Sequence, residues 1–205
     1  TETLEIDASN NVVSGTSYAD TFGETDNLSV DGGTSYLPGS VSEAADLVEG
    51  GNRDVSELEV TATDNVQADG ANDAYVNDDP VDLPDIDALT ISGATETVEV
   101  ETRFVIDESD AINNHTITDL TVTNNNSSNP AINVTDGHNS QSTFENLDVT
   151  SEESGLVVNA SGTDVNVIEV RDSDFDVAAD GIVLADGGDD RDGFVIDNVN
   201  VTGPG

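Results

Sequence analysis

The sequence ITDLTV at Ile117–Val122, followed by FENLDV at Phe144–Val149, decides the fold. Both hexapeptides have an apolar residue first, an Asp or Asn third, and apolar residues at the fourth and sixth positions. The same signature, loosely kept, occurs eight times at intervals of 24 to 31 residues. Self-similarity at such a period is typical of a solenoid, in which each repeat buries its apolar face only against its neighbours. The copies are TETLEI at Thr1, TDNLSV at Thr25, VSELEV at Val55, IDALTI at Ile86, ITDLTV at Ile117, FENLDV at Phe144, VRDSDF at Val170 and IDNVNV at Ile196.

The signature predicts a sharp bend between two short strands. Leu120 and Val122 are two residues apart and therefore share one face of a strand, whereas Ile117 has the wrong parity for an unbroken strand. A bend between Ile117 and Leu120 brings all three side chains to the interior. We expect Asp or Asn at this bend, because these are the non-glycine residues that most readily adopt the left-handed conformation. The expected bend residues, which stacking would place in one column, are Asn27, Asp119, Asn146, Asp172 and Asn198.

Each of the last repeats carries three short β-runs separated by turns rich in Gly, Asn, Asp and Ser. We therefore predict an all-β fold, a right-handed parallel β-helix (β-solenoid) of about seven three-strand coils with a period of 24–31 residues. A single domain, 1–205, contains the whole array, with loop insertions near 31–54 and 61–85. Within these insertions we expect a short surface helix at Ser40–Gly50 and a long polar loop at Ala68–Asp85.

Stacking of the coils predicts two inward columns of apolar side chains. Ser173 interrupts the first column, and we expect the larger Phe175 to fill the gap. The first column comprises Leu4, Leu28, Leu58, Leu89, Leu120, Leu147 and Val199, and the second comprises Ile6, Val30, Val60, Ile91, Val122, Val149, Phe175 and Val201.

These coils resemble the right-handed parallel β-helix of the pectate-lyase-like superfamily, most clearly from Ile86 to Gly205. The resemblance is to the fold repeat, so it implies parallel stacked strands and says almost nothing about activity. Two other folds stay open. A leucine-rich repeat has matching apolar spacing, but its ladder Asn occurs only at Asn125, and a β-sandwich also has regularly spaced short strands.

The chain has 44 acidic residues against four Arg and no Lys, giving a formal net charge of -40. In dilute buffer so much like charge opposes compaction, whereas at molar salt the Debye length falls to about 3 Å and the repulsion is screened. The composition is typical of a halophile, and we attribute the chain to a haloarchaeon or its virus. High charge with few aromatic residues also marks intrinsic disorder, but the regular repeat argues against disorder.

The same charge excludes classes of partner. Nucleic-acid binding needs a basic footprint that four scattered arginines do not supply, and no window has the roughly 18 apolar residues that membrane insertion requires. Glycans remain compatible with an acidic surface.

The start at Thr1, with no Met, suggests a mature product whose leader has been removed, and hence an extracellular, cell-surface or virion-surface location. Seven N-glycosylation sequons support export: Asn27, Asn114, Asn125, Asn126, Asn133, Asn159 and Asn200.

The sequence contains no recognisable catalytic constellation. With 44 acidic residues, carboxylate pairs arise everywhere by chance. His115 and His138 lie in polar segments without partners at metal-ligand spacing, and we interpret both as exposed turn residues. We expect the arginines to form isolated surface ion pairs; they are Arg53, Arg103, Arg171 and Arg191.

One segment indicates a calcium site. DGGDDRDGF at Asp186–Phe194 is similar to the calcium-binding nonapeptide of secreted repeat toxins, although only one copy occurs. The resemblance implies a structural Ca²⁺ ion, and NDDPVDLPDID at Asn77–Asp87 is a second oxygen-rich candidate. We expect no required cofactor. The carboxylates of the first site are Asp186, Asp189, Asp190 and Asp192.

Two functions are compatible with these observations. We expect a non-enzymatic structural or surface protein, such as an appendage or filament subunit, an adhesin or a virion fibre, whose uncapped coils stack head to tail. A piece cut from a longer solenoid would show the same uncapped ends. The alternative is a carbohydrate-active β-helix enzyme of the polysaccharide lyase or glycoside hydrolase type, or a sugar-binding relative. Three Tyr, five Phe and no Trp provide little surface for stacking sugars.

Overall fold

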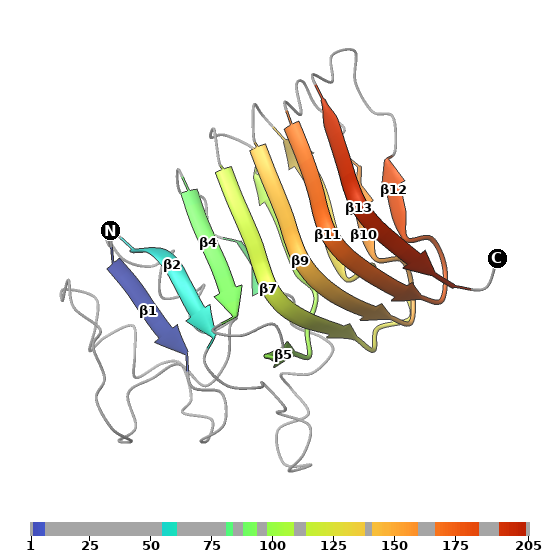
Figure 1. Ribbon diagram of the computed structural model, residues 1–205, viewed down its shortest axis with the longest axis horizontal. Helices are drawn as coiled ribbons and strands as arrows, with labels where there is room; N and C mark the ends of the chain where they lie inside the picture. Colours follow the sequence, from blue (N-terminus) through green and yellow to red (C-terminus); the bar gives the residue numbers. More distant parts are fainter. Residues whose placement is uncertain are drawn as a thin grey trace, which may run out of the picture.

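In the computed structural model the chain forms an all-β parallel solenoid of about three turns, built from two sheets (Figure 1). The structure describes residues 2–6, 55–60, 81–83, 88–93, 98–108, 114–137, 141–159, 167–184 and 193–203. Sheet A contains β1 (Glu2–Ile6), β2 (Val55–Val60), β4 (Ala88–Gly93), β5 (Glu99–Val100), β7 (Asn114–Asn124), β9 (Gln141–Ser151), β11 (Val167–Val177) and β13 (Phe194–Thr202). Sheet B contains β3 (Val81–Asp82), β6 (Phe104–Glu108), β8 (Ile132–Gly137), β10 (Leu156–Val158) and β12 (Ile182–Leu184).

Both sheets follow the order of the coils along the chain. Sheet A runs β1-β2-β4-β7-β9-β11-β13, with β5 also pairing with β7, and sheet B runs β12-β10-β8-β6-β3. All of these pairings are parallel. A sandwich of antiparallel sheets is therefore wrong for this chain, and the solenoid is confirmed.

The long strands of sheet A bend where the signature predicts. Asp119, Asn146, Asp172 and Asn198 have φ values of 57°, 54°, 46° and 53°, which is the left-handed region. On either side of the first bend, Ile117 and Leu120 are both fully buried although they are three residues apart. The bend therefore switches the parity of the strand, as predicted. Its expected counterpart Asn27 lies outside the described residues.

The bend residues form a polar column, which we call the Asx ladder: Asp119, Asn146, Asp172 and Asn198. The Nδ2 of Asn146 donates to Oδ1 of Asp119 at 2.6 Å, and the Nδ2 of Asn198 donates to Oδ1 of Asp172 at 2.6 Å. Alternation of Asp with Asn avoids stacking like charges on adjacent coils. Each amide thereby ties its own coil to the preceding one.

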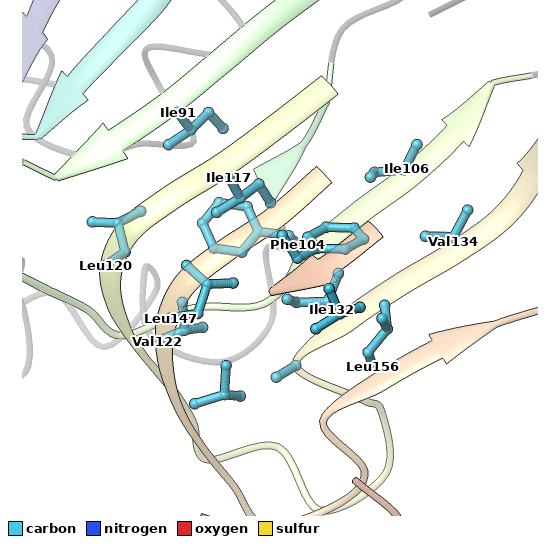
Figure 2. Close-up of a cluster of buried hydrophobic side chains, with 14 of the residues drawn as sticks. Ile91, Phe104, Ile106, Ile117, Leu120, Val122, Ile132, Val134, Leu147 and Leu156 are labelled. Atoms are coloured by element: carbon cyan, nitrogen blue, oxygen red, sulfur yellow. The ribbon is translucent and has the colours of Figure 1, made fainter. Parts of the chain in front are cut away.

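The core lies between the two sheets and is made of columns that run from coil to coil. Figure 2 shows side chains of β4, β7 and β9 facing those of β6, β8 and β10. The predicted pairs Leu120 with Leu147 and Val122 with Val149 are Cα partners. Another column of sheet A, which passes through the first position of the signature, comprises Leu4, Leu58, Ile91, Ile117, Phe144, Val170 and Ile196.

The predicted columns are wrong at the copies TETLEI, VSELEV and IDALTI. Leu4 and Leu58 align with Ile91 on the first arm of the coil, and not with Leu89 and Leu120. Ile91 pairs with Ile117, and not with Val122, so Leu89 and Ile91 both lie on the first arm of the coil. The partner of Val122 is Val100 on β5. The reason is an insertion, since residues 92–97 separate the two arms of this coil where the later coils have only a two-residue bend.

Most of the predicted loop insertions, 31–54 and 61–85, lie outside the described residues, as does the expected helix at Ser40–Gly50. The end of the second insertion is not a loop. Val81 and Leu83 are buried, and β3 pairs with β6 as the first described strand of sheet B. The polar composition of Ala68–Asp85 concealed this short apolar alternation.

Candidate assembly face

The last described coil leaves the core columns uncovered on one side. Ile196 and Val201 on β13 are 52% and 50% exposed, whereas their partners on β11, Val170 and Phe175, are 1% and 0% exposed. On sheet B, Leu184 of β12 is 36% exposed. We call these three exposed residues, with the partly buried Phe194 and Val199 of β13, the end face.

The end face has the same local construction as the interior coils. Asn198 bends β13 as Asn146 bends β9, so the apolar residues on both of its arms turn toward the solenoid interior. Among the described strands, β13 and β12 are the outermost strands of their sheets at this end (Figure 1). The end face therefore combines exposed apolar side chains with strand edges that no described strand covers, which is the usual template for strand addition.

Ser173 interrupts an apolar column but is fully satisfied. It is 2% exposed, its Oγ donates to the carbonyl of Arg171 at 2.6 Å, and it accepts from the N–H of Leu147 at 3.1 Å. Phe175, two residues on, is fully buried and its ring lies against Gly155, the residue before β10. The described contact of the ring is therefore with this glycine, and filling of the gap at Ser173 stays a prediction.

The prediction for His115 is wrong. His115 lies in β7, is 1% exposed, and its Nδ1 accepts from the N–H of Leu89 at 3.2 Å. Its Cα partners are Leu89 and Ser142, so it occupies an inward column of sheet A. The polar sequence around it suggested a turn, but a backbone donor satisfies the ring inside the core. His138 lies outside the described residues.

The two described arginines differ. Arg171 forms the expected surface ion pair, with its Nη2 3.0 Å from Oε2 of Glu169 on the same strand. The Nε of Arg103 is buried and has no hydrogen-bond partner among the described residues.

The predicted calcium ligands Asp186, Asp189, Asp190 and Asp192 lie outside the described residues. Of the second candidate, Asn77–Asp87, only residues 81–83 are described. Within the described ranges no group of three or more His, Asp or Glu is close enough together to hold a metal ion.

The structure sorts the sequons by exposure. The asparagines in strand β8 and in the turn after β7, Asn133 and Asn126, are partly buried, and Asn27 is outside the described residues. The exposed sequon asparagines are Asn114, Asn125, Asn159 and Asn200.

Sequence reasoning missed one carboxylate pair. Glu99 and Glu101 lie next to the second arm of β7, where Thr123 Oγ1 donates to Glu99 Oε1 at 2.8 Å and Asn125 Nδ2 donates to the Glu101 carboxylate. Burial, and then the charge of Glu99, raise the pKa of Glu101 above its usual value, while the bond from Asn125 opposes the shift. The alternation VEVET could have indicated that both glutamates share one face.

No family model, curated protein or solved structure matches the chain. In the part of the chain that the structure describes, no helix is long and apolar enough to cross a membrane.

Proposed function

We propose that this chain is an extracellular structural or surface protein of a halophile, a filament or appendage subunit, adhesin or virion fibre, that assembles by axial stacking of β-solenoid subunits. The observation that carries the proposal is the end face, where Ile196 and Val201 are half exposed while the members of their columns from β4 to β11 are buried. Burying such apolar area on association is favourable at about 25 cal/mol per Å² before the costs of association.

The proposed partner is a second copy joined head to tail. β1 and β13 are the two outermost described strands of sheet A, and all described neighbours in that sheet are parallel. If β1 of the next copy continues the register of the sheet, Leu4 takes the position opposite Ile196, because both belong to one column. Such a heterologous contact repeats and builds a filament unless it closes into a ring.

We propose further that the solenoid is right-handed, as in the pectate-lyase-like superfamily, and that the full chain contains about seven coils. The right-handed form follows from the handedness of crossover connections between parallel strands. A structural Ca²⁺ at Asp186, Asp189, Asp190 and Asp192 remains part of the proposal. A melting temperature that is unchanged by a chelator would contradict the calcium site.

Sedimentation velocity and electron microscopy of the protein in molar KCl test the stacking. We expect filaments or a ladder of oligomers, and we expect Ile196→Asp to abolish them by placing a charge in the contact. Thr150→Asp is the matched control, because it introduces the same charge at an exposed position on β9 and should assemble normally. A stable monomer at all salt concentrations would sink the proposal.

Because the chain has no cysteine, engineered cross-links report the polarity of the contact. Thr3→Cys and Val195→Cys, mixed as two single variants, should form a disulfide between subunits, since the continued register makes these residues Cα partners. A disulfide that joins two copies of the Val195→Cys variant would instead indicate a head-to-head contact and contradict the head-to-tail arrangement.

A second candidate function is supported by the pair Glu99 and Glu101. A carboxyl group with a raised pKa beside an ionised one is the arrangement that general acid–base hydrolysis of glycosides uses. This alternative predicts cleavage or binding of a neutral polysaccharide that Glu101→Gln abolishes. The test is a screen of polysaccharides for newly formed reducing ends, with Glu145→Gln, an exposed carboxylate on β9, as the control.

A further inference from the structure

We propose that salt gates the stacking of subunits through one cross-strand column of sheet A, which carries charged residues toward both ends. This inference rests on the proposed head-to-tail stacking and specifies its regulation. The column passes through the last residue before the Asx bend of each later coil, and its members are Glu5, Glu59, Ser92, Thr118, Glu145, Arg171 and Asp197.

Inside the chain, this column alternates in charge at its end. Arg171 is the Cα partner of both Glu145 and Asp197, so an arginine separates the two acidic residues. Its side chain also forms the ion pair with Glu169. Cross-strand neighbours of opposite charge are mildly stabilising, and like charges directly opposite each other are destabilising. The pairing of β9, β11 and β13 at this position therefore needs no salt to screen it.

Across the proposed contact, the alternation fails. Continuing the register makes Glu5 of the next copy the partner of Asp197, and Glu5 is followed in the column by Glu59. Neighbouring strands lie about 4.8 Å apart, so the contact places two acidic residues at the same register position of adjacent strands. Asp197 is exposed on the free chain, where water and ions can solvate it.

Salt weakens the charge repulsion across the contact and leaves the apolar attraction in place. At tenths molar salt the Debye length is about 10 Å, so the Asp197–Glu5 repulsion persists, whereas at molar salt it is about 3 Å and the repulsion is screened. The apolar part, formed by Ile196, Val201 and Leu184, requires no screening. Subunits should therefore separate in dilute buffer and stack in brine.

The test measures the salt concentration at half-assembly by light scattering in KCl, using the full chain. Asp197→Asn removes the repulsion from Glu5 without placing a second arginine opposite Arg171, and Coulomb's law in water predicts a roughly threefold gain in the association constant at tenths molar salt. The midpoint should therefore move to lower salt. Asp148→Asn is the matched control, because it makes the same change of charge at an exposed position on β9, two coils from the contact.

Circular dichroism of each sample restricts the comparison to salt concentrations at which the chain is folded. Equal shifts for Asp197→Asn and Asp148→Asn would overturn the gate, because net charge alone would then control assembly. Assembly of the unaltered chain that is independent of salt would overturn it too, while leaving the stacking intact. If the unaltered chain fails to assemble at any salt concentration, the stacking itself fails, and the gate falls with it.

Discussion

The strands β9 and β13 carry the same signature and the same bend, yet their side chains have different surroundings. Phe144 at the first position of FENLDV is fully buried, whereas Ile196 at the first position of IDNVNV is 52% exposed. The two bends have φ values within a degree of each other, 54° at Asn146 and 53° at Asn198. The hexapeptide therefore determines the shape of a coil, whereas the coils on either side determine whether its apolar residues are buried.

The largest expected effect tests this difference directly. Leu120→Ala removes a fully buried side chain between two sheets and should lower the free energy of unfolding by about 2–5 kcal/mol. Val201→Ala in the last coil, where the side chain is 50% exposed, should cost about 1 kcal/mol or less in the monomer. Urea unfolding in molar KCl measures both. Similar losses for the two variants would mean that the last coil is covered in solution.

Glycine positions give the next effect in size. A Cβ at Gly155 would collide with the Phe175 ring and lie 2.6 Å from the carbonyl oxygen of Gly181, so Gly155→Ala should cost about 1–3 kcal/mol. At Gly193, beside β13, a Cβ meets nothing within 4 Å. Gly193→Ala is therefore the control and should change stability by no more than about 0.5 kcal/mol. Tolerance of alanine at Gly155 would contradict the close approach of Phe175.

The bends should show a smaller contrast. Asn146→Ala puts alanine, which disfavours the left-handed region, at the bend and removes the hydrogen bond to Asp119. The two losses together should lower the free energy of unfolding by about 1–2 kcal/mol. Asn198→Ala should cost less, because its bond to Asp172 is exposed to water. Asn146→Gly restores the backbone freedom and should recover part of the loss. Thermal unfolding measures the stability of the three variants. Equal melting temperatures for Asn146→Gly and Asn146→Ala would refute the backbone argument.

The smallest effect concerns the irregular coil at the opposite end of the regular stack. The folded-state pKa of Glu101 is raised, so the folded chain binds this proton more tightly than the unfolded chain. Tighter binding of this proton stabilises the fold at a pH below the unfolded pKa of Glu101, and this stabilisation is lost as the pH rises through the folded pKa. Glu101→Gln should therefore be the more stable form at neutral pH, and the advantage should vanish in acid. Glu145→Gln controls for the change in charge, and an advantage that grows in acid would reverse the sign of the argument.

The fold was predictable because one feature, the wrong parity between Ile117 and Leu120, requires a bend, and the Asp or Asn between them can make it. Parity is a local property, so it can be found in a single sequence. The alignment of IDALTI failed because apolar spacing is the same on either arm of a coil, and only the pairing of Ile91 with Ile117 shows which arm is meant.

The candidate site was harder to predict for a related reason. Exposure of Ile196 depends on what lies beyond it, and the hexapeptide contains no information about that neighbour. His115 was misread because its nearest residues in sequence are polar, whereas the donor that satisfies it belongs to Leu89, a coil away. The sequence alternation places Glu99 and Glu101 on one face of a strand, but their hydrogen-bond partners Thr123 and Asn125 belong to the next coil and cannot be found from local sequence.

The split coil has a mechanical consequence. Hydrogen bonds between coils point along the solenoid axis, so under tension the interfaces between coils carry the same force in series, and the weakest one breaks first. β7, β9 and β11 pair along both of their arms, but β4 pairs with only the first arm of β7, and the short β5 pairs with part of the second. Described pairing is sparser still between β2 and β4, with four residue pairs, and between β3 and β6, with two. A pulled solenoid should therefore fracture between β2 and β4, next to the split coil, leaving the regular coils together as one block.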